Sequence, residues 1–399
     1  MTKTQHRRLA TAAACSSLFA FAALATVTPA ALNNIGRFYR ASDTTLGLLF
    51  LIQSLGFIVM VILGGRLSDR WRKLPVLLIG CLTQAVGAFI FWNTSDLSVA
   101  ATAMVIMGAG GGLTEGIAMA VVSELYTGDR RTSMLNASQV FFAIGAVTAP
   151  LVVSRLISLD MDWRLGYLWS GMACVVAGLI VISAMMTGRE KSMAEHRHEH
   201  HWKTLVTDPL VIALSAGILL YVSAECGQAN WLAVYFKKSL GSAEWLGAVS
   251  VSFFWGGIGL GRATAATVSR RIPNITTIIV SLALATLCQT ALLLIPHPAI
   301  ALGAVLLLGF CLGPVWPTIL GTAGTAYPRQ SGTLFGLLVG MGCAGIAIFP
   351  PLIGRLADLW GIRAPLWGCV GLLLINLVIF VRLRRRLHDH GHLSGVDIA

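Results

Sequence analysis

Hydrophobic runs of about 20 residues recur along this sequence, separated mostly by short polar turns, and a run of that length crosses a bilayer as an α-helix. Inside a membrane every backbone polar group must be paired, and helices achieve this within themselves. The sequence therefore predicts an all-α polytopic membrane protein. The twelve predicted helices cover residues 11–32, 44–65, 74–93, 98–124, 133–157, 164–187, 209–235, 244–265, 275–295, 299–322, 333–354 and 364–382.

The composition supports a membrane protein and argues against a nucleic-acid-binding one. Only 12% of the 399 residues are charged, against roughly 25% in an average soluble domain. The net charge is +12, but the basic residues are dispersed among the turns between helices and do not gather in one segment. This dispersal is typical of membrane topology, so we expect a lipid bilayer and a small molecule as partners, and no nucleic acid.

Most of the 29 lysines and arginines fall in the N-terminus, in every second turn and in the C-terminus. Basic residues favour the cytoplasmic side, so both termini are predicted to be cytoplasmic, in an inner or plasma membrane. One long polar stretch divides the helices into six and six. The predicted organisation is an N-terminal bundle at 1–187, a cytoplasmic linker at 188–208, and a C-terminal bundle with a basic tail at 209–399.

The two halves contain similar motifs in the same order. Residues 145–156 read GAVTAPLVVSRL and residues 345–356 read GIAIFPPLIGRL, so a glycine, a proline and an arginine recur at an offset of 200. GGRLSDRWRK, which begins at residue 64, and LGRATAATVSRR, which begins at residue 260, match at an offset near 196. A six-helix unit repeated in the same orientation is the plan of major facilitator transporters.

Residues 65–73, GRLSDRWRK, resemble the loop 2–3 signature of the major facilitator superfamily, without the glycine usual after its aspartate. The run LNASQVF at 135–141 and the run GPVWPTILG at 313–321 are similar to the fucose–galactose–glucose symporter branch. The resemblance implies that the first, fourth, seventh and tenth helices line a central cavity. It also implies a monomer that needs no cofactor.

Two acids, Glu115 and Glu225, lie well inside predicted helices, and we expect no lysine, arginine or histidine near them. Without a counter-charge, a buried carboxyl group is more easily protonated than ionised. Both acids are therefore predicted to carry the coupling proton or to contact the substrate; holding sodium remains an alternative. The symporter branch has an aspartate in its first helix, so Glu225 is the candidate to replace it. The first helix of this chain offers only uncharged polar residues, including Thr26, Thr28, Ser16 and Ser17, with Asn33 and Asn34 at its outer end.

Polar and aromatic residues near these acids are typical of sugar sites, where rings cover C–H faces and polar groups bind hydroxyls. Tyr221, Glu225 and Gln228 share one helical face, and Trp231 follows three residues later. The predicted substrate-binding residues are Asn136, Gln139, Tyr221, Gln228, Asn230, Trp231, Trp316 and Thr318. Interhelical packing is the alternative role of the amides and tryptophans.

A set of residues near the cytoplasmic helix ends, one glycine and four charged residues, is predicted to form the gate motif, whose charged members act as latches that set the conformational state. This set consists of Gly65, Asp69, Arg70, Arg262 and Arg270. Pro314 and Pro317 interrupt the tenth helix and permit a bend. The run HRHEHH at 196–201 lies in the longest loop, so we interpret it as a solvated linker and expect no metal site.

The most consistent function is a secondary transporter that imports a neutral hexose-like sugar with protons, by alternating access. The alternatives are a sodium-coupled sugar symporter and a proton-coupled exporter of drugs or metabolites. A P-loop sequence is absent, so nothing supports ATP-driven transport. An intramembrane enzyme would need a nucleophile with its base or metal ligands at depth, and a sensor would need a soluble output domain; neither is visible in the sequence, so no enzyme is expected.

Overall fold

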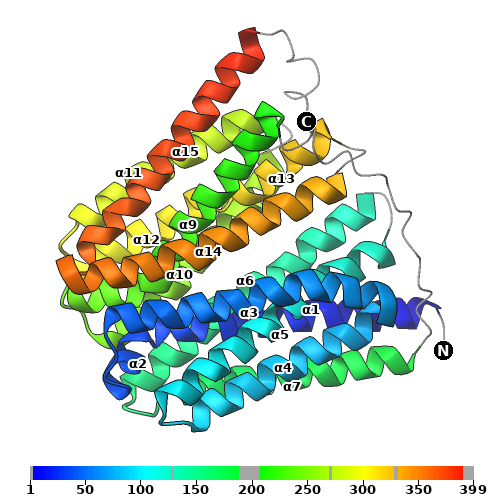
Figure 1. The fold of residues 1–399 in the computed structure, drawn as a ribbon, viewed down its shortest axis with the longest axis horizontal. Helices are drawn as coiled ribbons and strands as arrows, with labels where there is room; N and C mark the ends of the chain where they lie inside the picture. The colour runs from blue at the N-terminus through cyan, green and yellow to red at the C-terminus, as the bar shows by residue number, and fades with distance from the viewer. Residues whose placement is uncertain (1–2, 127–128, 188–206, 269–271, 328–330, 390–399) are drawn as a thin grey trace. The chain divides into compact units, whose positions relative to one another are not determined.

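The computed structural model describes residues 3–126, 129–187, 207–268, 272–327 and 331–389. Helices joined by short turns make up these ranges, which contain no strand (Figure 1), so the predicted all-α class is confirmed. The helices are α1 (Lys3–Ala30), α2 (Leu32–Phe38), α3 (Asp43–Trp71), α4 (Lys73–Asn93), α5 (Leu97–Leu125), α6 (Asp129–Ser158), α7 (Leu165–Met186), α9 (Pro209–Lys238), α10 (Glu244–Val268), α11 (Asn274–Leu294), α12 (Pro298–Leu312), α13 (Val315–Ala326), α14 (Ser331–Trp360) and α15 (Arg363–Asp389).

Eleven helical segments in the described residues are long and apolar enough to cross a membrane. One of them, Pro298–Ala326, contains α12 and α13, which are separated at Gly313 and Pro314. The predicted interruption of this helix is therefore present. The remaining predicted span corresponds to α10, which is not among the eleven and carries Glu244 and Arg262.

Short polar side chains determine where several helices begin. The hydroxyl oxygen of Ser42 accepts a hydrogen bond from the backbone N–H of Thr45 at the start of α3. Asp96 accepts two backbone N–H bonds at the start of α5, at 2.7 and 3.0 Å. Asp208 caps α9 at 2.8 Å, with Pro209 in the first turn. Each cap satisfies an N–H group that has no partner within its helix.

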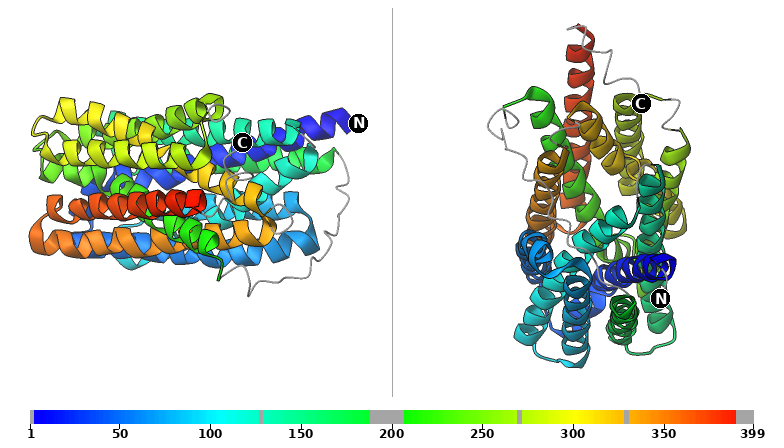
Figure 2. Two further views of the ribbon diagram at one scale, coloured as in Figure 1. Left: turned by 90° about the horizontal axis from the view of Figure 1, so that it is seen from above. Right: turned by 90° about the vertical axis from the view of Figure 1, so that its right-hand side faces the viewer.

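The helices cluster into two compact units. Unit 1 consists of Met1–His196 with Ala243–Ser252, and unit 2 of Arg197–Ser242 with Phe253–Ala399. Within each unit the helices run alongside one another (Figure 2). The start of α10 belongs to unit 1, where the Ser252 hydroxyl donates to the Val147 carbonyl at 2.8 Å. The domain boundaries at 187 and 208 border residues 188–206, outside the described ranges, and remain a prediction.

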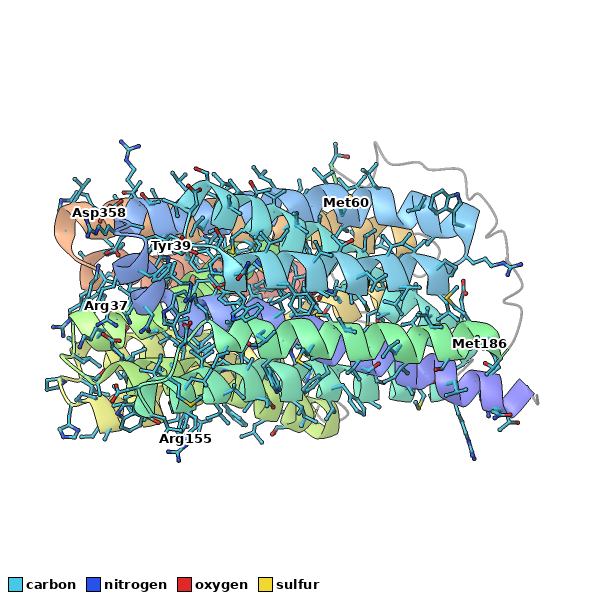
Figure 3. The ribbon with its side chains drawn as sticks, turned by 90° about the horizontal axis from the view of Figure 1, so that it is seen from below. Arg37, Tyr39, Met60, Arg155, Met186 and Asp358 are labelled. Carbon is cyan, nitrogen blue, oxygen red and sulfur yellow. The ribbon has the colours of Figure 1, made fainter. Side chains whose placement is uncertain are left out.

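Many large apolar side chains are exposed, as expected for surfaces that contact lipid. On α7 they follow helical spacing, at Met172, Val176 and Leu179, and Met186 near the end of the helix is 81% exposed (Figure 3). Exposed apolar surface on this scale is unusual for a soluble monomer and marks contact with a membrane or a partner. The exposure pattern therefore agrees with the polytopic class.

Glycines allow helix backbones to approach one another at corresponding places in the two units. A Cβ atom at Gly112 of α5 would overlap the Phe57 carbonyl oxygen of α3, and one at Gly313, beside α12, would lie 2.5 Å from the Ile258 carbonyl oxygen of α10. These two contacts are related by an offset of 201. The structurally equivalent positions of α3 and α10 are therefore 201 residues apart, and the offset of 196 that the sequence motifs predicted is wrong.

The crossing of α1 with α6 in unit 1 has its equivalent in the crossing of α9 with α14 in unit 2. A Cβ atom at Gly145 would overlap the Phe19 carbonyl oxygen, and one at Gly345 would lie 2.8 Å from that of Leu219. Both members of this contact are shifted by 200. The repeat found in the sequence is therefore also present in the packing of the helices.

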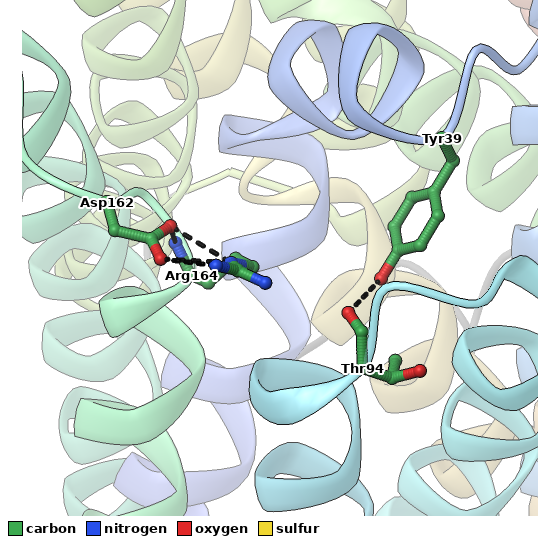
Figure 4. A network of polar contacts seen from close by, with 4 residues as sticks. All are labelled: Tyr39, Thr94, Asp162 and Arg164. Carbon is green, nitrogen blue, oxygen red and sulfur yellow. Dashed lines mark hydrogen bonds and ion pairs between the residues drawn. The ribbon is translucent and has the colours of Figure 1, made fainter.

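Polar contacts at one end of unit 1 join the turns between helices (Figure 4). The Tyr39 hydroxyl donates to the Thr94 carbonyl at 3.0 Å, and the Arg164 Nε donates to Asp162 Oδ2 at 2.9 Å. The Arg164 guanidinium also lies 4.8 Å from the centre of the Phe38 ring. Burial raises the pKa of Tyr39 to about 12, so its hydroxyl stays protonated and remains a donor.

Candidate functional site

Glu225 is buried inside α9, with 6% of its surface exposed. The Tyr221 hydroxyl donates a hydrogen bond to Glu225 Oε1 at 2.7 Å, and Tyr221 itself is fully buried. The two residues are four apart on one helix, so their side chains meet on the same face, as the sequence predicted. A polar group buried among apolar atoms is costly unless it is hydrogen-bonded, and Tyr221 supplies that bond.

Arg262 of α10 interacts electrostatically with both Glu225 and Tyr221. Its side chain is half-buried, and its Nε is buried without a hydrogen-bond partner. No ion pair joins Arg262 to Glu225 among the described residues, so the expectation that no basic residue neutralises Glu225 stays a prediction. The sequence placed Arg262 in a latch at the helix ends, and this role remains a prediction; the structure places Arg262 on the part of α10 that belongs to unit 2, the unit that also contains Glu225.

Gln228 and Trp231 connect α9 with neighbouring helices of unit 2. Gln228 Oε1 accepts a 2.7 Å bond from Gln289 of α11, and the Trp231 indole N–H donates to the Pro350 carbonyl of α14 at 2.9 Å. Both side chains are almost completely buried, whereas Asn230 is half-buried. These bonds fix the orientation of α9 within unit 2. A substrate-binding role for the three residues remains a prediction.

The α12–α13 break positions the predicted aromatic residue of unit 2. Trp316 is half-buried, and a Cβ atom at Gly342 of α14 would lie 3.0 Å from its ring and 3.4 Å from Val222 of α9. The Thr318 hydroxyl donates to the Pro314 carbonyl at 2.6 Å, within the first turns of α13. The Trp316 ring therefore lies at a point where α13, α14 and α9 approach one another.

In unit 1, Glu115 is half-buried on α5. The preceding Thr114 is buried, donates to the Gly110 carbonyl at 2.9 Å and accepts a 2.7 Å bond from Gln84 of α4. Gln84 is thus a polar partner at this position that the predicted set did not contain. A single amide in a helix gives little sequence signal, because the helix period alone does not show which neighbour it faces.

Of the two amides expected beside Glu115, Gln139 is half-buried, and its Nε2 is 3.1 Å from the Met119 sulfur. The Asn136 side chain lies outside the described residues. The grouping of Glu115 with these amides therefore remains a prediction.

Of the other predicted latch residues, only Gly65 lies among the described residues with its surroundings. Gly65 is exposed on α3, with open space around it. The side chains of Asp69 and Arg70, and the whole of Arg270, lie outside the described residues, as does the histidine-rich run. Among the residues that are described, no three His, Cys, Asp or Glu side chains are grouped to hold a metal ion.

Comparisons with known proteins identify the family. A model of the Major Facilitator Superfamily matches residues 11–350. A TsgA homolog from Buchnera aphidicola subsp. Baizongia pistaciae (strain Bp) is 21% identical, covering 94% of this chain and 97% of the relative. The corresponding TsgA homolog of Yersinia pestis (strain Pestoides F) is also 21% identical, with coverages of 93% and 94%.

Among solved structures, the fold resembles a bacterial homolog of the human lysosomal transporter Spinster. The crystal structure of that homolog, inward-facing and unoccupied, gives a TM-score of 0.76 at 15% identity, with 95% of this chain and 97% of the other covered. At this identity the likeness shows the fold alone. Because the family model covers most of the sequence, the chain belongs to the Major Facilitator Superfamily.

Proposed function

We propose that this multi-pass membrane transporter imports a neutral, hexose-like solute together with protons. The observation that carries the proposal is the buried Glu225 carboxyl group with its hydrogen bond from Tyr221. Ionisable side chains at membrane depth are rare and mark ion or substrate pathways. A carboxyl group can accept a proton when the site opens to one side and release it when the site opens to the other.

The sugar assignment is supported by polar and aromatic side chains within each unit. Unit 2 contains the carboxyl group of Glu225, the phenol of Tyr221 and the indole ring of Trp316. Unit 1 contains Glu115 and Gln139. Neutral sugars need hydrogen-bonding groups for their hydroxyls and flat apolar surfaces for their C–H faces. A helix interrupted at Gly313 and Pro314 provides a bend for alternating access.

Uptake into proteoliposomes tests the proposal. Labelled neutral hexoses are offered under an inward proton gradient, under an inward sodium gradient, and under neither. We expect the proton gradient alone to drive accumulation, and both Glu225→Gln and Glu115→Gln to abolish it. Glu124→Gln is the matched control, because Glu124 is paired with Lys73 near the end of α5 and its side chain is 47% exposed.

Each other outcome rejects part of the proposal. Accumulation driven by sodium alone supports the sodium-coupled alternative. Release of protons from vesicles when a drug or metabolite is added supports the exporter. Sugar binding without any uptake would contradict transport of that sugar.

The proposal includes a monomer in an inner or plasma membrane, with both termini in the cytoplasm. Light scattering of the purified protein measures its mass. Reporter fusions that are active only on one side of the membrane locate the termini. A dimer, or a periplasmic terminus, would contradict the corresponding part of the proposal.

A further inference from the structure

One side of α15, which runs as a single helix (Figure 1), is buried along most of its length. The buried side consists of Leu366, Cys369, Leu373, Asn376, Phe380 and Leu383. Asn376 Nδ2 donates to the Gly217 carbonyl of α9 at 3.0 Å, and a Cβ atom at Gly217 would lie 2.7 Å from the Phe380 ring. Because Leu383 is only 7% exposed, the rotation of α15 is fixed by packing almost to its end.

The opposite side of α15 is a stripe that is apolar for most of its length and basic at its end. Spacings of three and four residues keep side chains on one side of a helix. At these spacings the stripe runs through Trp367, Gly371, Ile375, Val378, Arg382 and Arg385. Ile375 is 54% exposed, and Trp367, Val378 and both arginines are exposed too.

The stripe has the length of the apolar part of a bilayer. From Trp367 to Arg385 the helix rises about 27 Å, at about 1.5 Å per residue, and a hydrocarbon core is about 30 Å thick. Tryptophan favours the membrane interfaces, and arginines near helix ends extend to the headgroups. Arg382 and Arg385 are therefore placed at the level of the lipid headgroups in the leaflet that the C-terminus faces.

No described acid balances these two arginines. The ion pairs among the described residues all lie within unit 1, whereas α15 belongs to unit 2. Asp389 is the first acidic residue of α15, and its side chain lies outside the described residues. Asp208, at the start of α9, caps that helix and accepts a 2.6 Å bond from the Tyr327 hydroxyl. The basic end of the stripe therefore favours an anionic partner from outside the chain.

We propose that the stripe binds an anionic phospholipid. An acyl chain lies along Ile375 and Val378, and the phosphate group contacts Arg382 and Arg385. The planar guanidinium group of arginine donates paired hydrogen bonds to phosphate, and anionic headgroups attract basic residues at the membrane surface. The proposal does not depend on which solute is transported.

Native mass spectrometry of the purified protein tests the site. Phosphatidylglycerol and phosphatidylcholine with the same acyl chains are titrated separately, and the lipid-bound fraction is measured. We expect phosphatidylglycerol to bind more tightly, and Arg382→Gln with Arg385→Gln to weaken its binding about fivefold for each arginine removed. Equal binding of both lipids to the wild type would overturn the proposal. A dimer that the double variant converts to a monomer would show that a second copy of the chain covers the stripe instead.

Arg384→Gln is the matched control for Arg382→Gln. Arg384 is exposed in the same turn, but it follows the buried Leu383 and lies off the stripe. General attraction of anionic lipid to a basic helix end would be weakened equally by either substitution. We expect Arg382→Gln to lose about fivefold in affinity and Arg384→Gln clearly less. Equal losses in the two variants would overturn a site on the stripe.

Photo-crosslinking of the wild-type chain keeps the proposal falsifiable if the variants fold poorly. A phosphatidylglycerol with a photoreactive acyl chain is mixed into phosphatidylcholine vesicles that contain the protein, and the adducts are located by peptide mass spectrometry. We expect adducts at Ile375 and Val378 that excess phosphatidylglycerol suppresses, and that phosphatidylcholine or inorganic phosphate does not.

Helix α7 is the comparison surface for the adducts. It exposes Met172 and Leu179 in the same way but contains no lysine or arginine. Adducts as frequent on α7 as on α15, or suppressed equally by both lipids, would overturn the proposal.

Discussion

The two units share a packing framework but differ in polar content. Gly112 and Gly145 of unit 1 correspond to Gly313 and Gly345 of unit 2, and each meets the equivalent backbone position of its partner helix. Such close approach of two backbones leaves no space for a side chain, so small residues are favoured at helix crossings in membranes. The framework therefore depends on a few positions where no other residue fits.

The polar side chains do not follow this symmetry. The positions of unit 1 that correspond to Tyr221, Glu225 and Arg262 are Phe21, Ala25 and Val61, and Phe21 stacks on Phe57 there. Conversely, Glu115 of unit 1 corresponds to Trp316 of unit 2. The acids of the two units therefore lie on non-equivalent helices. The shared backbone geometry of the two units therefore does not predict which helices carry the acidic side chains.

The largest effect is expected from substitution of the framework glycines. Gly112→Ala and Gly309→Ala each place a methyl group on a backbone carbonyl oxygen of the neighbouring helix. Overpacking of a rigid site costs about 1–3 kcal/mol, and more where only backbone can move. We expect a large loss of folded protein in both units, measured by fluorescence-detected gel filtration and thermal unfolding.

The same helices provide matched controls. Gly116 on α5 and Gly303 on α12 have open space where a Cβ atom would lie. Gly116→Ala and Gly303→Ala should therefore leave stability unchanged or slightly raise it, because alanine favours helices. Equal losses of folded protein in the control and framework variants would show that close backbone approach is not the reason these glycines are needed.

The next prediction transfers the acid between equivalent positions. In Glu225→Ala combined with Ala25→Glu, uptake should stay about tenfold or more below the wild type, because the transferred acid lacks its partners. Phe21 cannot donate a hydrogen bond to it, and Val61 carries no charge. The measurement is proton-driven uptake, with Glu225→Ala alone as the reference. Recovery of uptake would show that the position alone matters.

A smaller effect is expected from the bond between α9 and α14. Trp231→Phe removes the indole N–H donor to the Pro350 carbonyl but keeps an aromatic side chain. Hydrogen bonds between membrane helices contribute about 0.6 kcal/mol on average and about 1.7 at most. Thermal unfolding should show a loss in this range, and sugar binding is measured on the same variant. A specific loss of binding with unchanged stability would instead indicate that Trp231 contacts the substrate.

The sequence alone predicted the helices and the face of α9 on which Tyr221 and Glu225 meet. The apolar runs predicted the spans, and the i, i+4 spacing of Tyr221 and Glu225 predicted their contact. Such features depend on local periodicity, which one sequence contains. The fold class therefore followed from the sequence without any knowledge of tertiary contacts.

The environment of Arg262 could not be predicted in the same way. The sequence motif aligned Gly65 and Arg66 with Gly261 and Arg262, whereas packing aligns Val61 with Arg262. Only contacts between helices fix this register, because similar motifs in the two halves can lie at different depths. The partner of Gln228, which is Gln289 on α11, was hidden for the same reason.

The smallest effect on stability is expected from the arginines near the start of α7 in unit 1 and of α15 in unit 2. In unit 1 Arg164 pairs with Asp162 at 2.9 Å, whereas in unit 2 Arg363 donates to the Leu293 carbonyl at the end of α11. Partial burial acts to raise the pKa of Asp162, but hydrogen bonds from Arg164 outweigh it and hold the pKa below the ordinary value. The stabilisation is therefore present above the ordinary aspartate pKa of about 3.9 and is lost as the pH falls through the folded-state value.

Because the Asp162 side chain is 38% exposed, Asp162→Asn should cost less than about 1 kcal/mol at neutral pH. This cost should shrink in acid, where the wild type also loses the ionised carboxylate. Arg363→Gln removes bonds to a carbonyl group, which does not titrate, so its effect should stay constant over the same pH range. Thermal unfolding of both variants against the wild type, at neutral and acidic pH, measures the difference. An equal pH dependence in the two variants would contradict the assignment of different partners to the two arginines.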